Sequence, residues 1–166
     1  MTFGDIPAGA SLFIDANTFV YHFTPHPVFR PACEKLIERI ELRELTAFTS
    51  THVLTDLAHR MMTIEAIRRN GWPSAGIVRR LRKHPDEIKR LALFRQVIDE
   101  IPLLGIQVLV SSAASISSAA ALSQQHGLLS GDALIAAIMQ QVGLSQLASH
   151  DADFDRVPGL VRYAPA

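Results

Sequence analysis

The stretch Ser11-Leu12-Phe13-Ile14-Asp15-Ala16-Asn17 places a short apolar run directly before a carboxylate. This run predicts a buried strand over 11–14 that ends at Asp15. Similar runs predict further strands, and helical patterns separate them. The predicted strands cover 46–49, 106–110, 146–149 and, at an edge, 160–163; the predicted helices cover 28–42, a segment capped by Ser50, 113–126, and a segment capped by Ser130. Such alternation predicts a parallel sheet with helices on both faces.

The sequence therefore predicts one α/β domain over residues 1–166, with three α/β/α layers and a central, mostly parallel sheet of about five strands. A helical arm over about 64–101 interrupts the alternation. Gly71-Trp72-Pro73 breaks the helical pattern of the arm, so we expect one helix to begin at Pro73. Another is expected to run from about Asp86 to Ile98.

Charge is unevenly distributed along a chain that has no net charge. Residues 68–95 carry nine basic and two acidic side chains, a net charge of +7, and the remaining residues carry −7. A basic segment of this kind is expected to bind a polyanion such as nucleic acid. The alternative is a charged helix face that contacts only solvent. The candidates for contact with a nucleic-acid backbone are Arg79, Arg80, Arg82 and Lys83.

Composition argues against several other classes of protein. No apolar run reaches the roughly 18 residues that cross a membrane, and the N-terminus lacks the basic start of a secretory signal. The single cysteine, Cys33, cannot form an internal disulfide. We therefore expect a protein without a membrane segment that works in the reducing cytoplasm.

Four carboxylates occupy positions that a parallel sheet would bring together. Asp15 and Asp151 follow predicted strands, Asp132 lies in the first turn of a helix, and Asp56 lies about two turns into another. Carboxylates in one cleft repel each other unless a divalent cation offsets their charge, and Mg²⁺ or Mn²⁺ prefers such oxygen ligands. Asp15, Asp132 and Asp151 are therefore the predicted metal ligands, directly or through water. A zinc site at His52, Asp56 and His59 is a weaker alternative because no HExxH motif is present.

Taken in order, these motifs resemble those of PIN-domain ribonucleases, and in particular the VapC-type toxins of toxin–antitoxin pairs. The resemblance runs from about residue 11 to the C-terminus. It rests on four segments: Phe13-Ile14-Asp15-Ala16-Asn17, Asp56, Gly131-Asp132-Ala133-Leu134-Ile135-Ala136-Ala137, and Ser149-His150-Asp151-Ala152-Asp153-Phe154.

The resemblance implies Mg²⁺- or Mn²⁺-dependent endonucleolytic cleavage of RNA, by attack of water on a phosphate. It assigns catalytic roles to Asp15, Asp56, Asp132, Asp151 and the hydroxyl of Ser149, and a contact with a metal-bound water, a carboxylate or substrate to Asn17. The family usually has Glu at the second acidic position, so the shorter Asp56 is expected to reach the metal through water. We expect Asp153 to support the site and Asp155 to lie at the surface.

The resemblance also implies two protein partners, a small antitoxin and a second copy of the chain. An interface could use the apolar side chains of Phe19, Val20, Tyr21, Phe23, Met61 and Met62, although core packing is the favoured interpretation for most of them.

Two other functions fit part of the pattern. A receiver-like or phosphatase domain would use Asp15 as a phosphate acceptor. The phosphatase pattern needs an aspartate where Asn17 stands. A receiver needs a lysine late in the chain, but the last lysine here is Lys89. The other alternative is a non-catalytic RNA- or protein-binding module with the PIN fold.

Overall fold

Strand β1 (Ser11–Ile14) is the middle strand of a five-stranded sheet in which every neighbouring pair is parallel. The computed structural model describes all residues from 1 to 166. The sheet has the order β3-β2-β1-β4-β5, with β2 at Thr46–Ser50, β3 at Gln107–Leu109, β4 at Gln146–Ala148 and β5 at Val161–Tyr163. The predicted α/β class, the buried strand over 11–14 and the fifth strand at an edge are confirmed.

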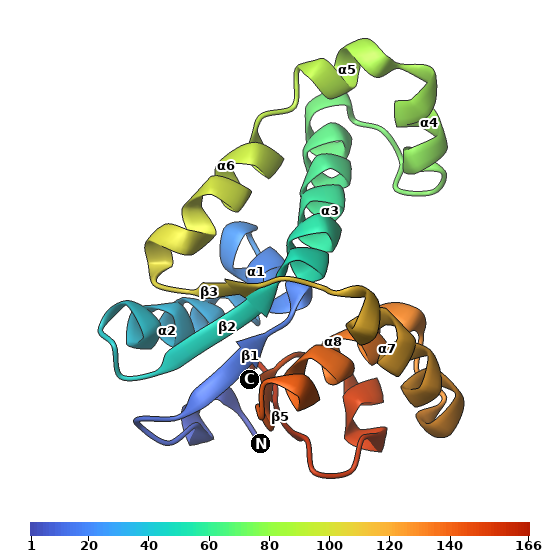
Figure 1. Ribbon diagram of the computed structural model, residues 1–166. Coiled ribbons are helices and arrows are strands. Elements are labelled where there is room, and N and C mark those ends of the chain that lie inside the picture. Colours follow the sequence, from blue (N-terminus) through green and yellow to red (C-terminus); the bar gives the residue numbers. More distant parts are fainter.

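Helices cover both faces of this sheet (Figure 1). They are α1 (Ala16–Phe23), α2 (Arg30–Glu41), α3 (Thr51–Asn70), α4 (Ile77–Lys83), α5 (Pro85–Lys89), α6 (Leu93–Glu100), α7 (Ala113–His126) and α8 (Ser130–Gln141), with short 3₁₀ segments η1 (Phe3–Asp5), η2 (Ile101–Leu104) and η3 (Ala152–Arg156). Connections between parallel strands are right-handed. The helices between β1 and β3 therefore lie on one face, and the α7–α8 hairpin lies on the other.

The order of the strands reverses next to β1, and this reversal positions a crevice. The chain steps from β1 to β2 and β3, and then returns across β1 to form β4. Helices leave β1 and β4 toward opposite faces, so a crevice opens at the carboxyl ends of these two strands. Asp15 directly follows β1, and Ser149 directly follows β4.

Buried hydroxyl groups connect the strands where they end. The Thr49 hydroxyl donates to the carbonyl oxygen of Ile14 at 3.0 Å, and the Thr18 hydroxyl donates to that of Ala148 at 3.1 Å. The amide of Asp15 also donates to the carbonyl of Ala148. These bonds satisfy backbone acceptors beyond the regular ladder, and they fix the crevice residues relative to the sheet.

Several helix boundaries agree with the sequence and others differ. The hydroxyl of Ser50 accepts from the amide of Val53, as expected of an N-cap, and α7 ends at Gly127, whose φ of +66° glycine adopts readily. Ser130 does not cap α8; it is the first helical residue, after Leu129. Helix α1 was not predicted, because its eight residues follow the strand without a break.

The arm is divided differently from the prediction. Its first helix, α4, begins at Ile77 rather than at Pro73, after Gly76 with a φ of +71°. The helix expected from Asp86 to Ile98 is two helices, α5 and α6, with a break near Ala92. The carboxylate of Glu65, on α3, accepts hydrogen bonds from the amides of Ala92 and Leu93 at the start of α6. A side chain distant in sequence thus supplies this cap, which no local pattern announces.

A small separate core holds α4 and α5 against the far end of α3. It consists of the buried side chains of Ala66, Ile77, Leu81 and Leu91. Figure 1 shows α4 and α5 at the end of α3 that points away from the sheet. Fourteen residues separate Asp56 from the last residue of α3, Asn70, and at 1.5 Å per residue this is roughly 20 Å of helix.

The main core contains two residues that had been considered for an interface. Phe19 and Met61 are fully buried there, so neither is available to a partner. Val20, Tyr21 and Phe23 are partly buried against the same core, and Met62 packs against the core of the arm.

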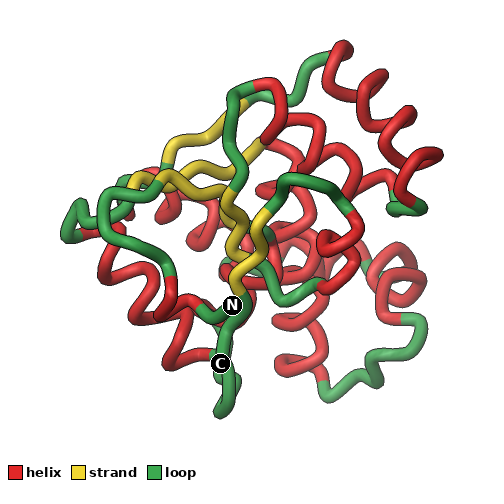
Figure 2. The backbone as a smooth tube through the Cα atoms, turned by 90° about the horizontal axis from the view of Figure 1, so that it is seen from below, coloured by secondary structure: helices red, strands yellow, loops and turns green.

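The two termini lie side by side (Figure 2). Thr2 and Ala164 form a parallel bridge next to the sheet, and the amide of Phe3 donates to the carbonyl of Ala164. None of the helices combines the length and the apolar character needed to cross a bilayer.

Candidate active site

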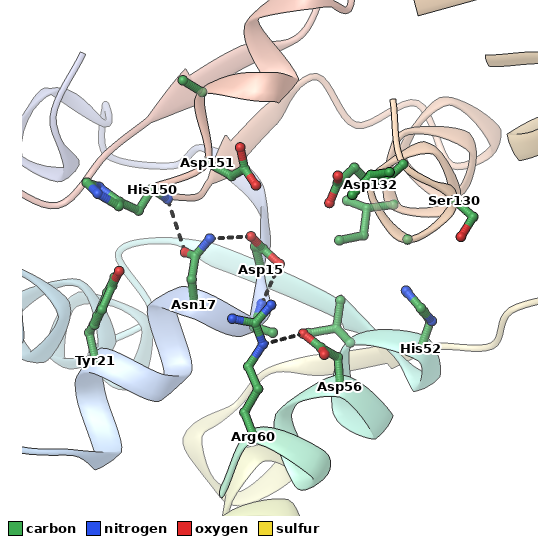
Figure 3. A pocket seen from close by; sticks show the side chains of 16 residues that line it. Asp15, Asn17, Tyr21, His52, Asp56, Arg60, Ser130, Asp132, His150 and Asp151 are labelled. Carbon is green, nitrogen blue, oxygen red and sulfur yellow. Dashed lines mark hydrogen bonds and ion pairs between the residues drawn. The ribbon is translucent and has the colours of Figure 1, made fainter. Parts of the chain in front are cut away.

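The crevice at the ends of β1 and β4 is a cavity of about 620 Å³. All four carboxylates singled out in the sequence line it: Asp15, Asp56, Asp132 and Asp151 (Figure 3). Asp15 comes from the start of α1, Asp56 from α3, Asp132 from the first turn of α8, and Asp151 from the turn before η3. Four separate elements therefore place negative charge in one pocket.

Asp15 is the most deeply buried of these carboxylates, with 8% of its surface exposed. One carboxylate oxygen accepts from the amide of Ala16 at 2.6 Å, and the other accepts from the Ser149 hydroxyl at 2.7 Å and from the Asn17 amide group. Burial raises the pKa of Asp15, and the bonds from Ser149 and Ala16 oppose this effect. These donors hold the carboxylate in one orientation.

Ser149 connects Asp15 to the rest of the site. Its fully buried hydroxyl donates to Asp15 and accepts from the side-chain amide of Asn17 and the backbone amide of Asp151, both at 3.0 Å. The Asn17 carbonyl oxygen accepts from the backbone amide of His150 at 3.0 Å. Ser149 and Asn17 therefore belong to one network with Asp15, in which they fix the turn that carries Asp151.

The carboxylates also interact electrostatically. Burial and the charges of Asp151 and Asp15 raise the pKa of Asp132 to about 6. Such a shift indicates a site in which negative charge lacks compensation, and a cation would supply it.

The donor set fits a hard divalent ion that keeps part of its water shell. No three His, Cys, Asp or Glu side chains are close enough to hold an ion together. Mg²⁺ commonly takes one or two carboxylates directly and keeps several waters, so carboxylates spread around a cavity suit it. Asp15, Asp132 and Asp151 offer oxygen ligands only. His52 lines the same cavity, but His59 does not, so the three residues of the zinc alternative do not converge.

Arg60 is a site residue that sequence reasoning missed. It lines the pocket one helical turn after Asp56, and its guanidinium group pairs with the Asp56 carboxylate at 2.7 Å (Figure 3). Its positive charge also partly opposes the rise in the pKa of Asp15 and of Asp132. The i,i+4 spacing of Asp56 and Arg60 on a predicted helix was the signal that could have identified it.

Asp153 and Asp155 do not line the pocket. The backbone amide of Asp153 donates to the Asp151 carboxylate at 2.9 Å, while the Asp153 side chain pairs with Arg156. Asp155 lies at the surface and forms two hydrogen bonds of 2.8 Å with Arg162. In turn, Arg162 donates to the carbonyl oxygen of Ser149.

The basic residues proposed to contact substrate lie outside the pocket. Arg79, Arg80, Arg82 and Lys83 belong to α4, beyond the far end of α3. Arg80 lies over the ring of Trp72, 5.6 Å from its centroid. Asn17, the other proposed substrate contact, does line the pocket.

Three further residues line the pocket that the sequence pattern did not identify as substrate contacts. Tyr21 and His150 form one side of the pocket, and His52 lies on another, near Ser130 (Figure 3). Tyr21 was considered only for packing or an interface. Single tyrosine and histidine residues carry no distinctive spacing, so only the folded arrangement identifies them.

Comparison with solved structures shows similar folds at low sequence identity. VapBC2 from Rickettsia felis, bound to a DNA fragment from its promoter, is 19% identical with a TM-score of 0.59, over 94% of this chain and 99% of the other. VapC20 from Mycobacterium tuberculosis, a toxin that cleaves the sarcin–ricin loop, is 18% identical with a TM-score of 0.59, over 87% and 92%. A toxin–antitoxin complex from Klebsiella pneumoniae is 17% identical with a TM-score of 0.52, over 90% of this chain and 95% of the other.

Sequence comparison gives a family and no individual relative. No curated protein sequence matches the chain. The profile of the PIN domain matches residues 12–160, a range that includes the four carboxylates and Ser149. With this match over most of its length, the chain belongs to the PIN domain family.

Proposed function

We propose that this protein is a Mg²⁺- or Mn²⁺-dependent endoribonuclease, the toxin of a type II toxin–antitoxin pair that acts in the cytoplasm. The observation that carries the proposal is the convergence of Asp15, Asp56, Asp132 and Asp151 on one pocket of a PIN domain. The fold shared with VapC20, a sarcin–ricin loop cleaving toxin, supports RNA as the substrate.

Each side chain has a role that follows from its environment. Asp15, Asp132 and Asp151 would hold the ion, which when bound supplies positive charge to the phosphate that is cleaved. Ser149 and Asn17 orient Asp15 by hydrogen bonding. Asp56, which reaches the pocket from α3, would orient a water or accept its proton. Arg60 supplies a fixed positive charge beside the pocket, where it can bind a phosphate oxygen.

The test is cleavage of RNA by the purified protein with Mg²⁺, with Mn²⁺, and with a chelator. We expect cleavage that requires either ion and that falls by roughly 100-fold or more in Asp15→Asn, because a buried carboxylate that would hold the ion is lost. Asp99→Asn is the matched control, since Asp99 is an exposed carboxylate on α6, outside the pocket. Equal cleavage by wild type and Asp15→Asn would refute the proposal. A wild type that binds RNA but never cuts it would favour the non-catalytic PIN-fold module.

We also propose a small antitoxin partner and self-association into a homodimer. The fold likeness to VapBC2 and to the Klebsiella pneumoniae complex supports the antitoxin. Leu129, which is 75% exposed at the edge of the pocket, offers an apolar contact for an inserted segment. Purification from the native host tests for a bound antitoxin, and mass determination by light scattering tests for the homodimer. RNA end mapping after induction identifies the substrate.

A further inference from the structure

One side of the active-site pocket consists of rings rather than carboxylates. Tyr21, on α1, and His150, between β4 and η3, line the pocket on the side away from Asp132 and His52 (Figure 3). His150 is an exposed residue and Tyr21 is a partly exposed one. The roles proposed above leave these two residues without a function.

Two further rings support this pair from behind. The His150 ring is 4.5 Å from that of Phe29, centroid to centroid, and Phe29 stacks on His26 at 4.6 Å with the two planes 4° apart. Tyr21 lies 4.8 Å from His26, 5.0 Å from Phe29 and 5.9 Å from His150. All these separations lie in the range of favourable aromatic contacts. The cluster is therefore a pre-formed surface rather than two independent side chains.

The backbone joins this surface directly to the catalytic network. The amide of His150 donates to the Asn17 carbonyl oxygen, and the Asn17 amide group donates to Asp15. His150 thus holds the network through its backbone amide, and its ring packs against those of Tyr21 and Phe29 at the side of the pocket. A nucleotide whose phosphate lies at the carboxylates would carry its base toward this side of the pocket.

We propose that Tyr21 and His150 form a base-stacking subsite for the nucleotide next to the cleaved phosphate. The proposal rests on the proposed ribonuclease function and deepens it by naming the side chains that contact the base. Stacking on aromatic side chains tolerates any base, because every base has a π-face. The subsite would therefore bind its nucleotide with little preference for the identity of the base.

The experiment combines a protein variant with an altered RNA. The cut site is first mapped on a single-stranded RNA, and versions of this RNA are made with an abasic nucleotide at each position flanking the cut. We expect His150→Ala to lower kcat/KM by roughly 5- to 100-fold, chiefly through KM, as expected for one lost stacking contact. One abasic position should cause a similar loss in wild type and little further loss in His150→Ala.

Controls separate stacking from structural effects. His150→Ala keeps the backbone amide that binds Asn17, so the Asp15 network stays intact. His59→Ala removes an exposed histidine of α3 outside the pocket and should leave kcat/KM unchanged. Tyr21→Phe keeps the ring, so it should lose less activity than Tyr21→Ala, which removes the ring. A thermal melt of each variant reports whether it is folded.

The outcomes distinguish this inference from the function on which it rests. If wild type cuts no RNA with either metal ion, the ribonuclease proposal fails. If wild type cuts RNA but His150→Ala and every abasic substrate react at the normal rate, the stacking subsite is refuted and the ribonuclease remains.

Discussion

Asp132 shows how the carboxylates of this site act on stability and on function in opposite directions. Burial and three neighbouring aspartates raise its pKa from 3.8 to about 6, so its charge near neutral pH costs folding free energy. Functional sites keep such unfavourable charges because the charges are needed to bind a ligand or to react. Ser149 and Asn17 contribute in the other sense, since they satisfy the buried carboxylate of Asp15.

Asp132→Asn should therefore stabilise the metal-free protein while abolishing cleavage. Between pH 3.8 and about 6 the folded state binds a proton that the unfolded state has released, so stability falls as pH rises and the full cost is present above about pH 6. Asparagine is uncharged in both states, so the variant does not bear this cost. Because the side chain is partly exposed, we expect a gain of about 1–2 kcal/mol near pH 8.

Urea denaturation of both proteins in a chelator, near pH 8 and again near pH 4, measures this difference. The gap should narrow at the lower pH, where Asp132 is protonated in the folded state and no longer carries a buried charge. Added Mg²⁺ should stabilise wild type more than the variant. An asparagine variant less stable than wild type near pH 8 would contradict the electrostatic account.

At the scale of elements, α4 and α5 are the part of the arm that lies at the end of α3 away from the sheet. Its own small core packs against the distal half of α3, and Glu65 caps α6 from the same helix. Lys89 and Arg90 are paired with acidic neighbours, whereas Arg79, Arg82 and Lys83 are exposed on α4. The arm therefore offers positive charge at a distance from the carboxylates, where it can act on affinity rather than on chemistry.

Replacement of Arg79, Arg82 and Lys83 by alanine should weaken RNA binding and leave kcat nearly unchanged. Each lost phosphate contact should reduce the slope of log affinity against log salt by about 0.7 for a single strand. Binding titrations at several salt concentrations measure the slope. Lys35→Ala, at an exposed position of α2, is the control for a lost surface charge. An unchanged slope would mean that the charged face of α4 contacts only solvent.

At the scale of the whole molecule, one core joins the sheet to the helices on either face. Cys33, on α2, is fully buried in this core together with the side chains of β1. Burial raises the pKa of its thiol to about 12. The residue is therefore a thiol without a chemical role whose reactivity depends on whether the core is intact.

Cys33 should resist alkylation in the folded protein near pH 8 and react at once in denaturant. The thiolate is the reactive form, and both burial and the raised pKa suppress it. Labelling with iodoacetamide, followed by mass spectrometry across a urea gradient, should give the same midpoint as loss of helical circular dichroism. Rapid labelling without denaturant would show that α2 detaches from the sheet on its own.

The sequence by itself determined the strands, most helices and the candidate carboxylates. Short apolar runs and helical periodicity are local signals, and Asp15, Asp132 and Asp151 follow or begin elements in a way that a single chain displays. The same signals failed where a boundary depends on a distant group. The start of α6 is fixed by Glu65, and no pattern near Ala92 reveals it.

Only the tertiary structure decided how these parts act together. The order β3-β2-β1-β4-β5 sets β1 beside β4 and so brings Asp15 to Ser149, 134 residues away. The packing of the helices places Arg60 in the pocket, α4 far from it, and Tyr21 beside His150. Periodicity reports which face of an element is buried, but the packing of distant elements, driven by burial of their apolar faces, decides which side chains share a pocket.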